Sequence, residues 1–137
     1  MTKDHDIRDA CRRLIAEFVW HVDRNDYHAL VELFAPDGVF ERPGAIMAGR
    51  QAILAAMELR SRDRLTRHFC TDPIIDIVSP TAANGRCYVS LKSAPRAERG
   101  DQSGMRVTLV GEYHDRFVLT GDGWRIAYRT ARIISQD

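Results

Sequence analysis

The hydrophobic pattern of this chain changes period near residue 65, and this change limits most strongly the folds that it can adopt. Residues 6–24 carry apolar side chains at intervals of three and four, which indicates an amphipathic helix. Residues 50–62 are rich in strong helix formers. The later segments rich in Val, Ile, Thr and aromatic residues are 66–78, 83–93, 105–119 and 124–134. This order predicts an α+β fold in which helices cover one face of a curved antiparallel sheet.

Shorter elements are expected between the two long helices. Asn25 or Asp26 is expected to cap a short helix over 27–35, which the sequence "APDG" would end. The sequence "VFER" then fits a short strand at 39–42. The sequence "TGDG" predicts a hairpin between the last two strands, and the polar stretch 94–104 is expected to be the most mobile loop. Without an internal repeat or linker, residues 1–137 are predicted to form a single domain.

Composition excludes several functional classes. The formal net charge is only +1, so no overall field would attract nucleic acid or an anionic membrane. No apolar run approaches the roughly 20 residues that cross a bilayer, and the charged N-terminus lacks a signal-peptide core. The three cysteines, Cys11, Cys70 and Cys87, are far apart and odd in number, which argues against a disulfide framework. We therefore expect a cytoplasmic protein with reduced, packed cysteines.

The residues that could carry chemistry are few. Lys92 is the only non-terminal amine outside the N-terminal segment, and no cationic neighbour would activate it. The arginine-rich stretch 60–67 fits the C-terminal end of the helix before it, where cations interact well with the helix dipole. The histidines are His5, His21, His28, His68 and His114, and their spacing matches no metal motif, so no metal is predicted. Proton transfer by a histidine paired with a carboxylate remains.

His68 stands near the start of the β-prone run "LTRHFCTDPIIDIV". It either lies half exposed at a strand end or points into a pocket, where it would need an acidic partner. Asp23 lies on the flank of the first helix, about a third of a turn from the centre of the apolar stripe at 100° per residue. Periodicity alone therefore leaves Asp23 as a solvated residue in the last helical turn.

Strand alternation gives further expectations. In the segment 83–93, Cys87, Val89 and Leu91 would face the core, with Tyr88, Ser90 and Lys92 facing away. In the last strand, Arg129 falls in a row with Ala127, Ala131 and Ile133, opposite Trp124, Ile126 and Tyr128. An arginine in an apolar row is either paired in a pocket or extends from a strand end into solvent.

Four motifs in order resemble the SnoaL-like branch of the nuclear transport factor 2-like superfamily. They are "FVWHVDRNDYHALVELFAPDGVFER", "GRQAI", "RHFCTDPIIDIV" and "GEYHDRFVLTGDGWRIAYRTARI", and the resemblance runs from about residue 7 to residue 134. It implies a conical α+β barrel, in which a strongly bent, mainly antiparallel sheet and three N-terminal helices enclose an apolar cavity. It also implies a homo-oligomer, with a trimer favoured over a dimer, and no cofactor.

Within that branch the chain is most similar to scytalone dehydratase, bile acid 7α-dehydratase and hexachlorocyclohexane dehydrochlorinase. The resemblance places Asp23, His68 and Arg129 at the catalytic positions of these lyases. It implies that His68 removes a proton from carbon, Asp23 orients its ring, and Arg129 stabilises a leaving group or oxyanion. The implied activity is a dehydratase-type β-elimination. Phe18 replaces a hydrogen-bonding residue of the relatives, so Arg129, Trp20, Tyr113 or water would have to assist the leaving group.

The implied substrate is a small hydrophobic or aromatic molecule. The residues expected to bind it, all of which core packing would also explain, are Phe18, Trp20, Phe34, Val89, Leu91, Val107, Leu109 and Tyr113. Three other functions stay open at this point. They are an isomerase of the ketosteroid type, which would not need His68, a structural subunit like the small chain of aromatic-ring dioxygenases, and a ligand-binding protein without turnover.

Overall fold

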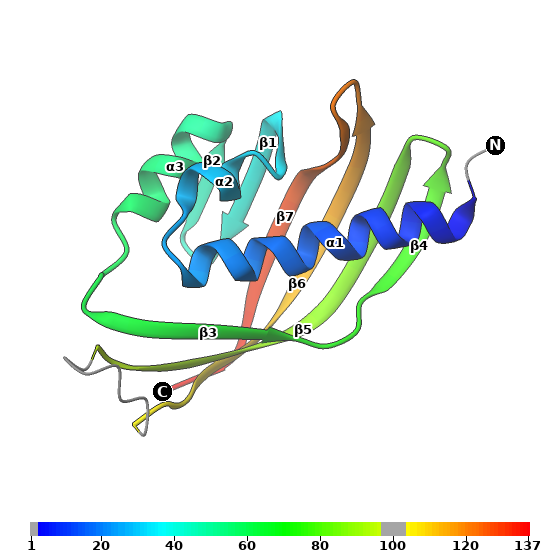
Figure 1. Cartoon of the computed structure of the whole chain (residues 1–137). Helices are drawn as coiled ribbons and strands as arrows, with labels where there is room; N and C mark the ends of the chain where they lie inside the picture. Colours follow the sequence, from blue (N-terminus) through cyan, green and yellow to red (C-terminus); the bar gives the residue numbers. More distant parts are fainter. Residues whose placement is uncertain (1–2, 97–103) are drawn as a thin grey trace.

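The computed structural model describes residues 3–96 and 104–137. The elements in chain order are α1 (Asp4–Asp23), α2 (Tyr27–Val31), β1 (Phe34–Arg42), β2 (Ala45–Ala48), α3 (Arg50–Glu58), β3 (Arg64–Cys70), β4 (Ile74–Ser79), β5 (Ala82–Pro95), β6 (Arg106–Thr120) and β7 (Gly123–Gln136). Three helices precede a run of long strands, and the strands curl around α1 (Figure 1). The predicted α+β class is confirmed.

The strands form one seven-stranded sheet in the order β2-β1-β7-β6-β5-β3, with β4 also paired to β5. All neighbours are antiparallel except β1 and β7, which run parallel. The expected strongly bent, mainly antiparallel sheet is therefore present. In Figure 1, α1 crosses one face of the sheet, while α2 and α3 lie with β1 and β2 near one end of it.

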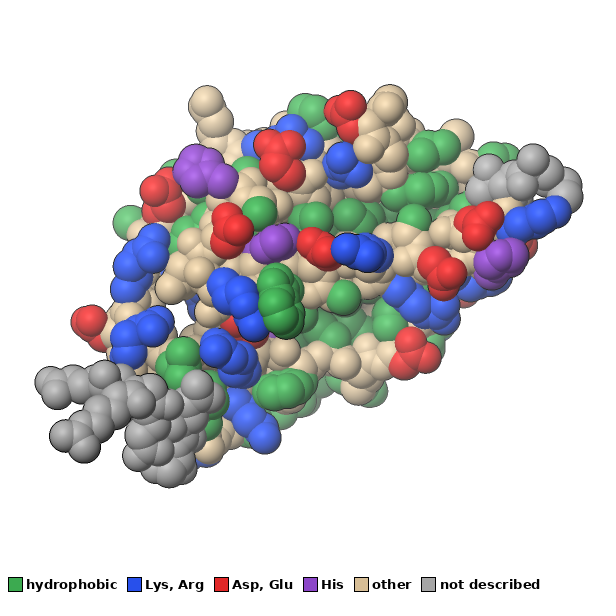
Figure 2. Space-filling view, in the orientation of Figure 1, with side chains coloured by type: hydrophobic (Ala, Val, Ile, Leu, Met, Phe, Trp, Pro, Cys, Tyr) green, Lys and Arg blue, Asp and Glu red, His purple; other side chains and the backbone are tan. Residues whose placement is uncertain are grey.

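The predicted apolar stripe of α1 is buried along its whole length. Its members are Ile7, Cys11, Leu14, Ile15, Phe18 and Val22. The outer side of the helix carries acidic, basic and histidine side chains (Figure 2). Along the helix, Glu17 pairs with Arg13 and His21, one turn away on either side. None of the helices in the described part of the chain is long and apolar enough to cross a membrane.

Four aromatic rings join α1 to the sheet. Phe18 of α1 packs edge-on against Phe34 and Phe40 of β1 and Tyr113 of β6, with ring centroids 5.7 to 6.2 Å apart. Such contacts bury large apolar areas and add favourable edge-to-face interactions. This aromatic cluster, Phe18, Phe34, Phe40 and Tyr113, fixes the position of the C-terminal half of α1 above the sheet.

The predicted strand 66–78 is two strands. β3 ends at Cys70, residues 71–73 leave the ladder, and β4 resumes pairing with β5 at Ile74. Pro73 has no N–H to offer a ladder, which explains why pairing stops there. The break separates β3 from β4, so that β3, which carries His68, runs in a different direction from β4 and lies beneath the end of α1 (Figure 1).

The boundaries near β1 also differ from the prediction. The short helix ends at Val31, and the "APDG" residues belong to β1, where a register shift between Phe34 and Val39 accommodates them. The hairpin partner β2 was not predicted. Part of the stretch expected to be a loop, Ala94 and Pro95, extends β5, and 97–103 lie outside the described residues.

Alternation holds in β5, where Cys87 and Val89 are buried and Tyr88 and Lys92 are exposed. It fails in β7, because Ile126 and Arg129 are both fully buried although the simple pattern puts them on opposite faces. A register shift against β6 between Arg116 and Phe117 inserts one extra residue of β7 between them. A bulge of this kind reverses the faces of all the residues that follow it.

Candidate active site

The carboxylate of Asp23 lies at the junction between α1 and β3. Asp23 is the last residue of α1 and is only 8% exposed. The chain turns directly after it, through Asn25 in the left-handed region with φ of 57°. Asp23 therefore faces the sheet rather than solvent, against the expectation from periodicity.

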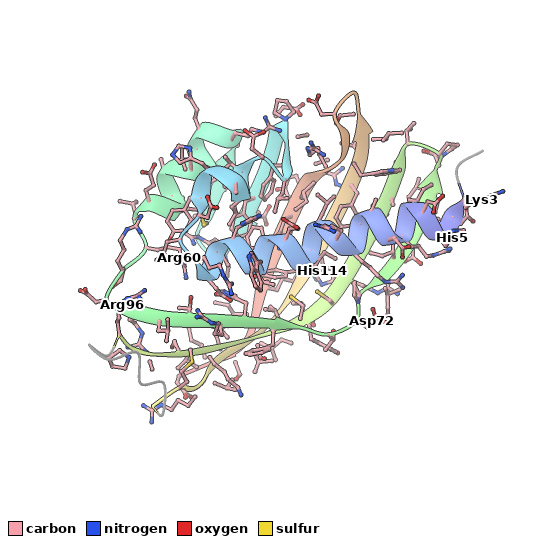
Figure 3. The ribbon with its side chains drawn as sticks, in the orientation of Figure 1. Lys3, His5, Arg60, Asp72, Arg96 and His114 are labelled. Carbon is pink, nitrogen blue, oxygen red and sulfur yellow. The ribbon has the colours of Figure 1, made fainter. Side chains whose placement is uncertain are left out.

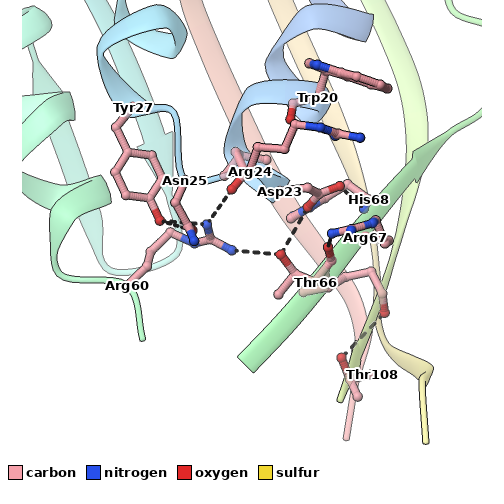
Figure 4. Close-up of polar contacts among 12 residues, drawn as sticks. Trp20, Asp23, Arg24, Asn25, Tyr27, Arg60, Thr66, Arg67, His68 and Thr108 are labelled. Atoms are coloured by element: carbon pink, nitrogen blue, oxygen red, sulfur yellow. Dashed lines mark hydrogen bonds and ion pairs between the residues drawn. The ribbon is translucent and has the colours of Figure 1, made fainter. Parts of the chain in front are cut away.

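Three hydrogen bonds hold this carboxylate (Figure 4). His68 approaches with its ring, since Nδ1 lies 2.6 Å from Asp23 Oδ1, and with its backbone N–H, which donates to Oδ2 at 2.7 Å. The Thr66 hydroxyl donates to Oδ1 at 3.1 Å. Arg60 in turn donates from Nη2 to the Thr66 hydroxyl at 3.3 Å. One acidic side chain thus joins the end of a helix to two residues of a strand.

Arg60 also closes the C-terminal end of α1. Its Nη1 donates to the Val22 carbonyl oxygen at 3.0 Å and to the Tyr27 hydroxyl at 3.1 Å. Figure 3 shows Arg60 reaching from the segment after α3 towards this end of α1. A cation at a helix C-terminus interacts favourably with the unpaired carbonyls and the dipole. The sequence had indicated this role for the arginine-rich stretch, but at the end of α3 rather than of α1.

These contacts determine the protonation state of Asp23. Burial alone would raise the pKa of the carboxyl, but the hydrogen bonds and charge of His68, together with the Thr66 hydroxyl, hold its pKa below the usual value. An ionised carboxylate only accepts hydrogen bonds, so His68 Nδ1 must carry the proton that they share. In the neutral ring, Nε2 is then the unprotonated nitrogen, which is the arrangement that a general base requires.

Replacing Thr66 by valine is expected to raise the pKa of Asp23 and to lower the free energy of unfolding at pH 7 by about 1 kcal/mol. Because the folded pKa of Asp23 is depressed, its contribution is full above the unfolded value of about 3.9 and is lost as pH falls through the folded pKa. The loss in Thr66→Val should therefore shrink in acid, as measured by urea unfolding at neutral and acidic pH. Thr108→Val is the control, since the Thr108 hydroxyl bonds to Ser93 and, among the described residues, to no carboxylate. An equal loss at both pH values in Thr66→Val would contradict the assignment.

His68 lines a pocket of about 230 Å³, which is slightly below the usual range of about 300–1,000 Å³ for ligand sites. The other lining residues come from β1, the turn after it, β5, β6 and β7, and they are Phe40, Arg42, Pro43, Val89, Leu91, Leu109, Tyr113, Ala131, Arg132 and Ile133. The wall is thus largely apolar, with His68, Tyr113 and two arginines as its polar groups. Such an environment strengthens interactions with any charge that develops inside it.

Half of the residues predicted to bind substrate line this pocket, namely Val89, Leu91, Leu109 and Tyr113. Phe18 and Phe34 do not; they lie in the core, where they pack against the pocket residue Phe40. Phe18 and Phe34 therefore support the wall instead of forming it.

The predictions for Trp20 and Val107 are wrong. Trp20 is 57% exposed, and the guanidinium carbon of Arg24 lies 3.3 Å from the centroid of its ring. Two residues along a helix correspond to about 200°, so Trp20 faces away from the side on which Phe18 is buried. Val107 is 42% exposed near the start of β6, beyond the pocket.

The residues that the sequence analysis missed come from β1 and β7. Phe40 and Arg42 stand on β1, and Ala131 and Arg132 stand on β7, which pairs with β1 in parallel. These strands are far apart in the sequence, and no local pattern indicates a parallel pairing over that distance. The one available signal was the row that places Ala131 with Arg129.

Arg129 does not line the pocket, which corrects its expected direct contact with substrate. It is fully buried, and its Nε and Nη2 donate to the two carboxylate oxygens of Asp115 at 2.7 and 2.9 Å. Burial alone would lower the pKa of Arg129, but Asp115 raises it and keeps the guanidinium charged. The guanidinium carbon lies 3.9 Å from the ring centroid of Tyr113 and 4.4 Å from that of Phe18. Arg129 thus lies behind Tyr113.

Tyr113 is a polar wall residue whose ring contacts this buried pair through Arg129. Burial raises the pKa of its phenol, which the neighbouring charge of Arg129 partly opposes. The phenol is therefore protonated at neutral pH and can donate a hydrogen bond into the pocket. Within 3–96 and 104–137, no group of three histidine, cysteine, aspartate or glutamate side chains is arranged to hold a metal ion.

Several solved structures are similar to this chain in overall fold. A candidate scytalone dehydratase from Novosphingobium aromaticivorans is 27% identical, with a TM-score of 0.78 over 94% of this chain and 85% of that one. Rv3472, a Mycobacterium tuberculosis protein of unknown function, is also 27% identical, with a TM-score of 0.77 over 90% and 69% of the two chains. An NTF2-like protein with a cystatin-like fold from N. aromaticivorans, at 23% identity and a TM-score of 0.81 over 100% and 94%, shares the fold.

Sequence comparison identifies the family. No curated protein matches the chain significantly. The SnoaL-like domain matches residues 4–130, which include all of α1, β3 and the first eight residues of β7. The resemblance of the four sequence motifs is thereby confirmed, and the chain belongs to the SnoaL-like domain family.

Proposed function

We propose that this protein is a cofactor-independent lyase that carries out a dehydratase-type β-elimination on a small hydrophobic or aromatic substrate. The observation that carries the proposal is the His68–Asp23 pair. The ring nitrogen Nδ1 of His68 is 2.6 Å from the buried Asp23 carboxylate, whose pKa is held below its usual value. The His68 ring also borders a largely apolar pocket. An imidazole that is fixed in one tautomer beside a largely apolar pocket is suited to remove a proton from carbon.

In the proposed reaction, His68 Nε2 takes the proton from a carbon next to a carbonyl group. The electron pair of the broken C–H bond forms the new C=C bond, and the C–O bond to the β-hydroxyl breaks. The hydroxyl leaves as water with the proton that Tyr113 donates. The imidazolium of His68, stabilised by Asp23, then returns a proton to the Tyr113 oxygen through the pocket, which restores both groups.

Arg129 has an indirect role in this scheme. Its guanidinium stacks on the Tyr113 ring and is fixed by both oxygens of Asp115. A fixed cation behind the phenol favours the tyrosinate that forms when the proton leaves. Arg129 is therefore a positioning residue that acts through Tyr113.

The family and one solved relative support this class of reaction. The SnoaL-like family includes polyketide cyclases and dehydratases, and the N. aromaticivorans protein with 27% identity is a candidate scytalone dehydratase. The assay we propose uses aryl ketones with a β-hydroxyl group, because the adjacent carbonyl makes their α-protons acidic enough for an imidazole base to remove. Formation of the conjugated enone is followed by absorbance, and deuterium at the α-carbon should slow it. Failure of every member of such a series would contradict the proposal.

Changing Tyr113 to phenylalanine separates the acid from the base. Phenylalanine keeps the ring that packs on Phe18 and Arg129 but loses the proton donor. We expect kcat for β-hydroxy substrates to fall by about 10²-fold or more, which is the usual contribution of a general acid. A β-chloro analogue releases chloride, which needs no proton, so its kcat should be nearly unchanged. Equal losses on both substrates would show that Tyr113 supports the fold of the pocket and is not the acid.

A further inference from the structure

Two arginines border the pocket of His68. Arg42 is near the end of β1, and Arg132 is on β7. Both also border a larger, more open hollow of about 760 Å³, which shares Arg42, Pro43, Ala131, Arg132 and Ile133 with the pocket of His68. Arg42 and Arg132 are therefore among the residues that border both the inner pocket and the outer hollow, and we call this shared border the mouth.

Neither arginine is neutralised within the described part of the chain. No described carboxylate lies within 4.0 Å of Arg42 or Arg132, as is also true of most arginines in the described part of the chain; Arg12, Arg13, Arg50, Arg86 and Arg129 do have such a partner. The inner pocket has no acidic residue in its lining, and Glu41, which lines the outer hollow, bonds to Tyr128. Two cations on one mouth repel each other unless an anion lies between them.

The backbone near Arg132 is held in place. A register shift between Val110 and Gly111 of β6 adds an extra residue to β7 just beyond Arg132. A Cβ atom on Gly111 would lie 2.3 Å from the Arg132 carbonyl oxygen, so only glycine allows the two strands to approach this closely. Bulges commonly redirect side chains at functional sites. Here the bulge lies beside the residues of β7 that line the mouth.

We propose that the substrate carries a carboxylate group at the end remote from the reacting carbon, and that Arg42 and Arg132 bind it at the mouth. The apolar body would then lie in the inner pocket with its reacting carbon near His68. Guanidinium groups are well matched to carboxylates because they offer paired N–H donors in one plane. This inference rests on the proposed function only in taking the pocket of His68 as the place of binding.

The test compares two probes of nearly equal shape, 4-phenylbutanoate and 4-phenylbutanamide, which differ in charge. Binding is measured by calorimetry, and perturbation of the His68 ring signal in NMR spectra shows that the probe occupies this pocket. The carboxylate is expected to bind about tenfold more tightly than the amide at low salt, and the difference should shrink as salt is added.

Arg42→Gln and Arg132→Gln should each weaken binding of the carboxylate about three- to tenfold, a modest effect because Arg42 is half-buried and Arg132 is exposed. Binding of the amide should be unchanged. Arg13→Gln is the matched control. It removes the same charge from the outer side of α1, where Arg13 is 78% exposed. Four results would each overturn the proposal. They are equal affinity for the two probes, a preference for the carboxylate that remains in the Arg42→Gln/Arg132→Gln double variant, an equal loss in Arg13→Gln, and no binding of either probe.

The result is independent of turnover. His68→Ala should retain the preference for the carboxylate, because the base is not part of the anion site. If the preference depends on Arg42 and Arg132 but no elimination is found, the lyase proposal alone is wrong. If elimination of neutral ketones is found and the charge preference is absent, the anion site alone is wrong.

Discussion

His68→Gln is expected to lower kcat/KM for elimination by about 10²- to 10⁴-fold, the range that a general base contributes. Glutamine cannot take a proton from carbon, but it retains the backbone N–H that donates to Asp23 at 2.7 Å. The hydrogen bond from Thr66 also remains. The fold should therefore be kept, and the loss should appear in kcat more than in KM.

Asp23→Asn should show a loss of similar size for a different reason. An amide is neutral, so it cannot stabilise the imidazolium, and its NH₂ group favours the tautomer in which Nδ1 lacks the proton. His28→Gln is the control, since His28 is exposed on α2. The measurement is steady-state kinetics together with thermal unfolding of each variant. Retained activity in His68→Gln would remove the central part of the proposed function.

Asp115→Ala is expected to have the largest effect on stability, about 3–5 kcal/mol, because it leaves the charge of Arg129 buried without a partner. Arg129→Met should be destabilising for the same reason, through the unpaired Asp115. The double variant Asp115→Leu/Arg129→Met should recover much of the loss, since apolar residues of similar size can replace a buried pair. Free energies of unfolding in urea would measure all three.

The exposed pair Arg86–Asp76 provides the comparison. Its side chains are 50% and 61% exposed, so Arg86→Gln should cost at most about 1 kcal/mol. If Asp115→Ala cost no more than Arg86→Gln, the buried pair would not support the site as described. If Asp115→Ala retained full stability but lost activity on β-hydroxy substrates alone, its role would be confined to the charge behind Tyr113.

Local periodicity predicted the parts of the fold that depend on local sequence. The apolar stripe of α1 and the alternation of β5 were predicted because each buried residue repeats at the spacing of its element. The break between β3 and β4 was missed because the run 66–78 is β-prone throughout, and Pro73 alone signals the interruption. The parallel pairing of β1 with β7 depends on tertiary structure, and no local pattern encodes it.

The site was predictable to a similar extent. Periodicity put Asp23 on a helix flank, and only the family resemblance singled it out, because the turn at Asn25 and the approach of β3 decide which way it faces. The buried partner of Arg129 was not predicted, since Asp115 stands on a strand that passes from apolar to charged residues without a clear pattern. Trp20 was misplaced because an aromatic residue next to a buried stripe resembles a pocket wall.

The hold of Asp23 on His68 bears on how this protein could acquire new substrates. The Asp23 carboxylate accepts hydrogen bonds from both the backbone N–H and the ring of His68. The imidazole therefore has little torsional freedom to lose when a ligand binds. The same hydrogen bonds join α1 to β3, so a substitution that reorients the His68 ring would also weaken the packing of α1 on β3. Substitutions that change substrate specificity should therefore occur in β1, β7 and the turn at Pro43, because these segments border the same pocket but do not hydrogen-bond to Asp23 in the described structure.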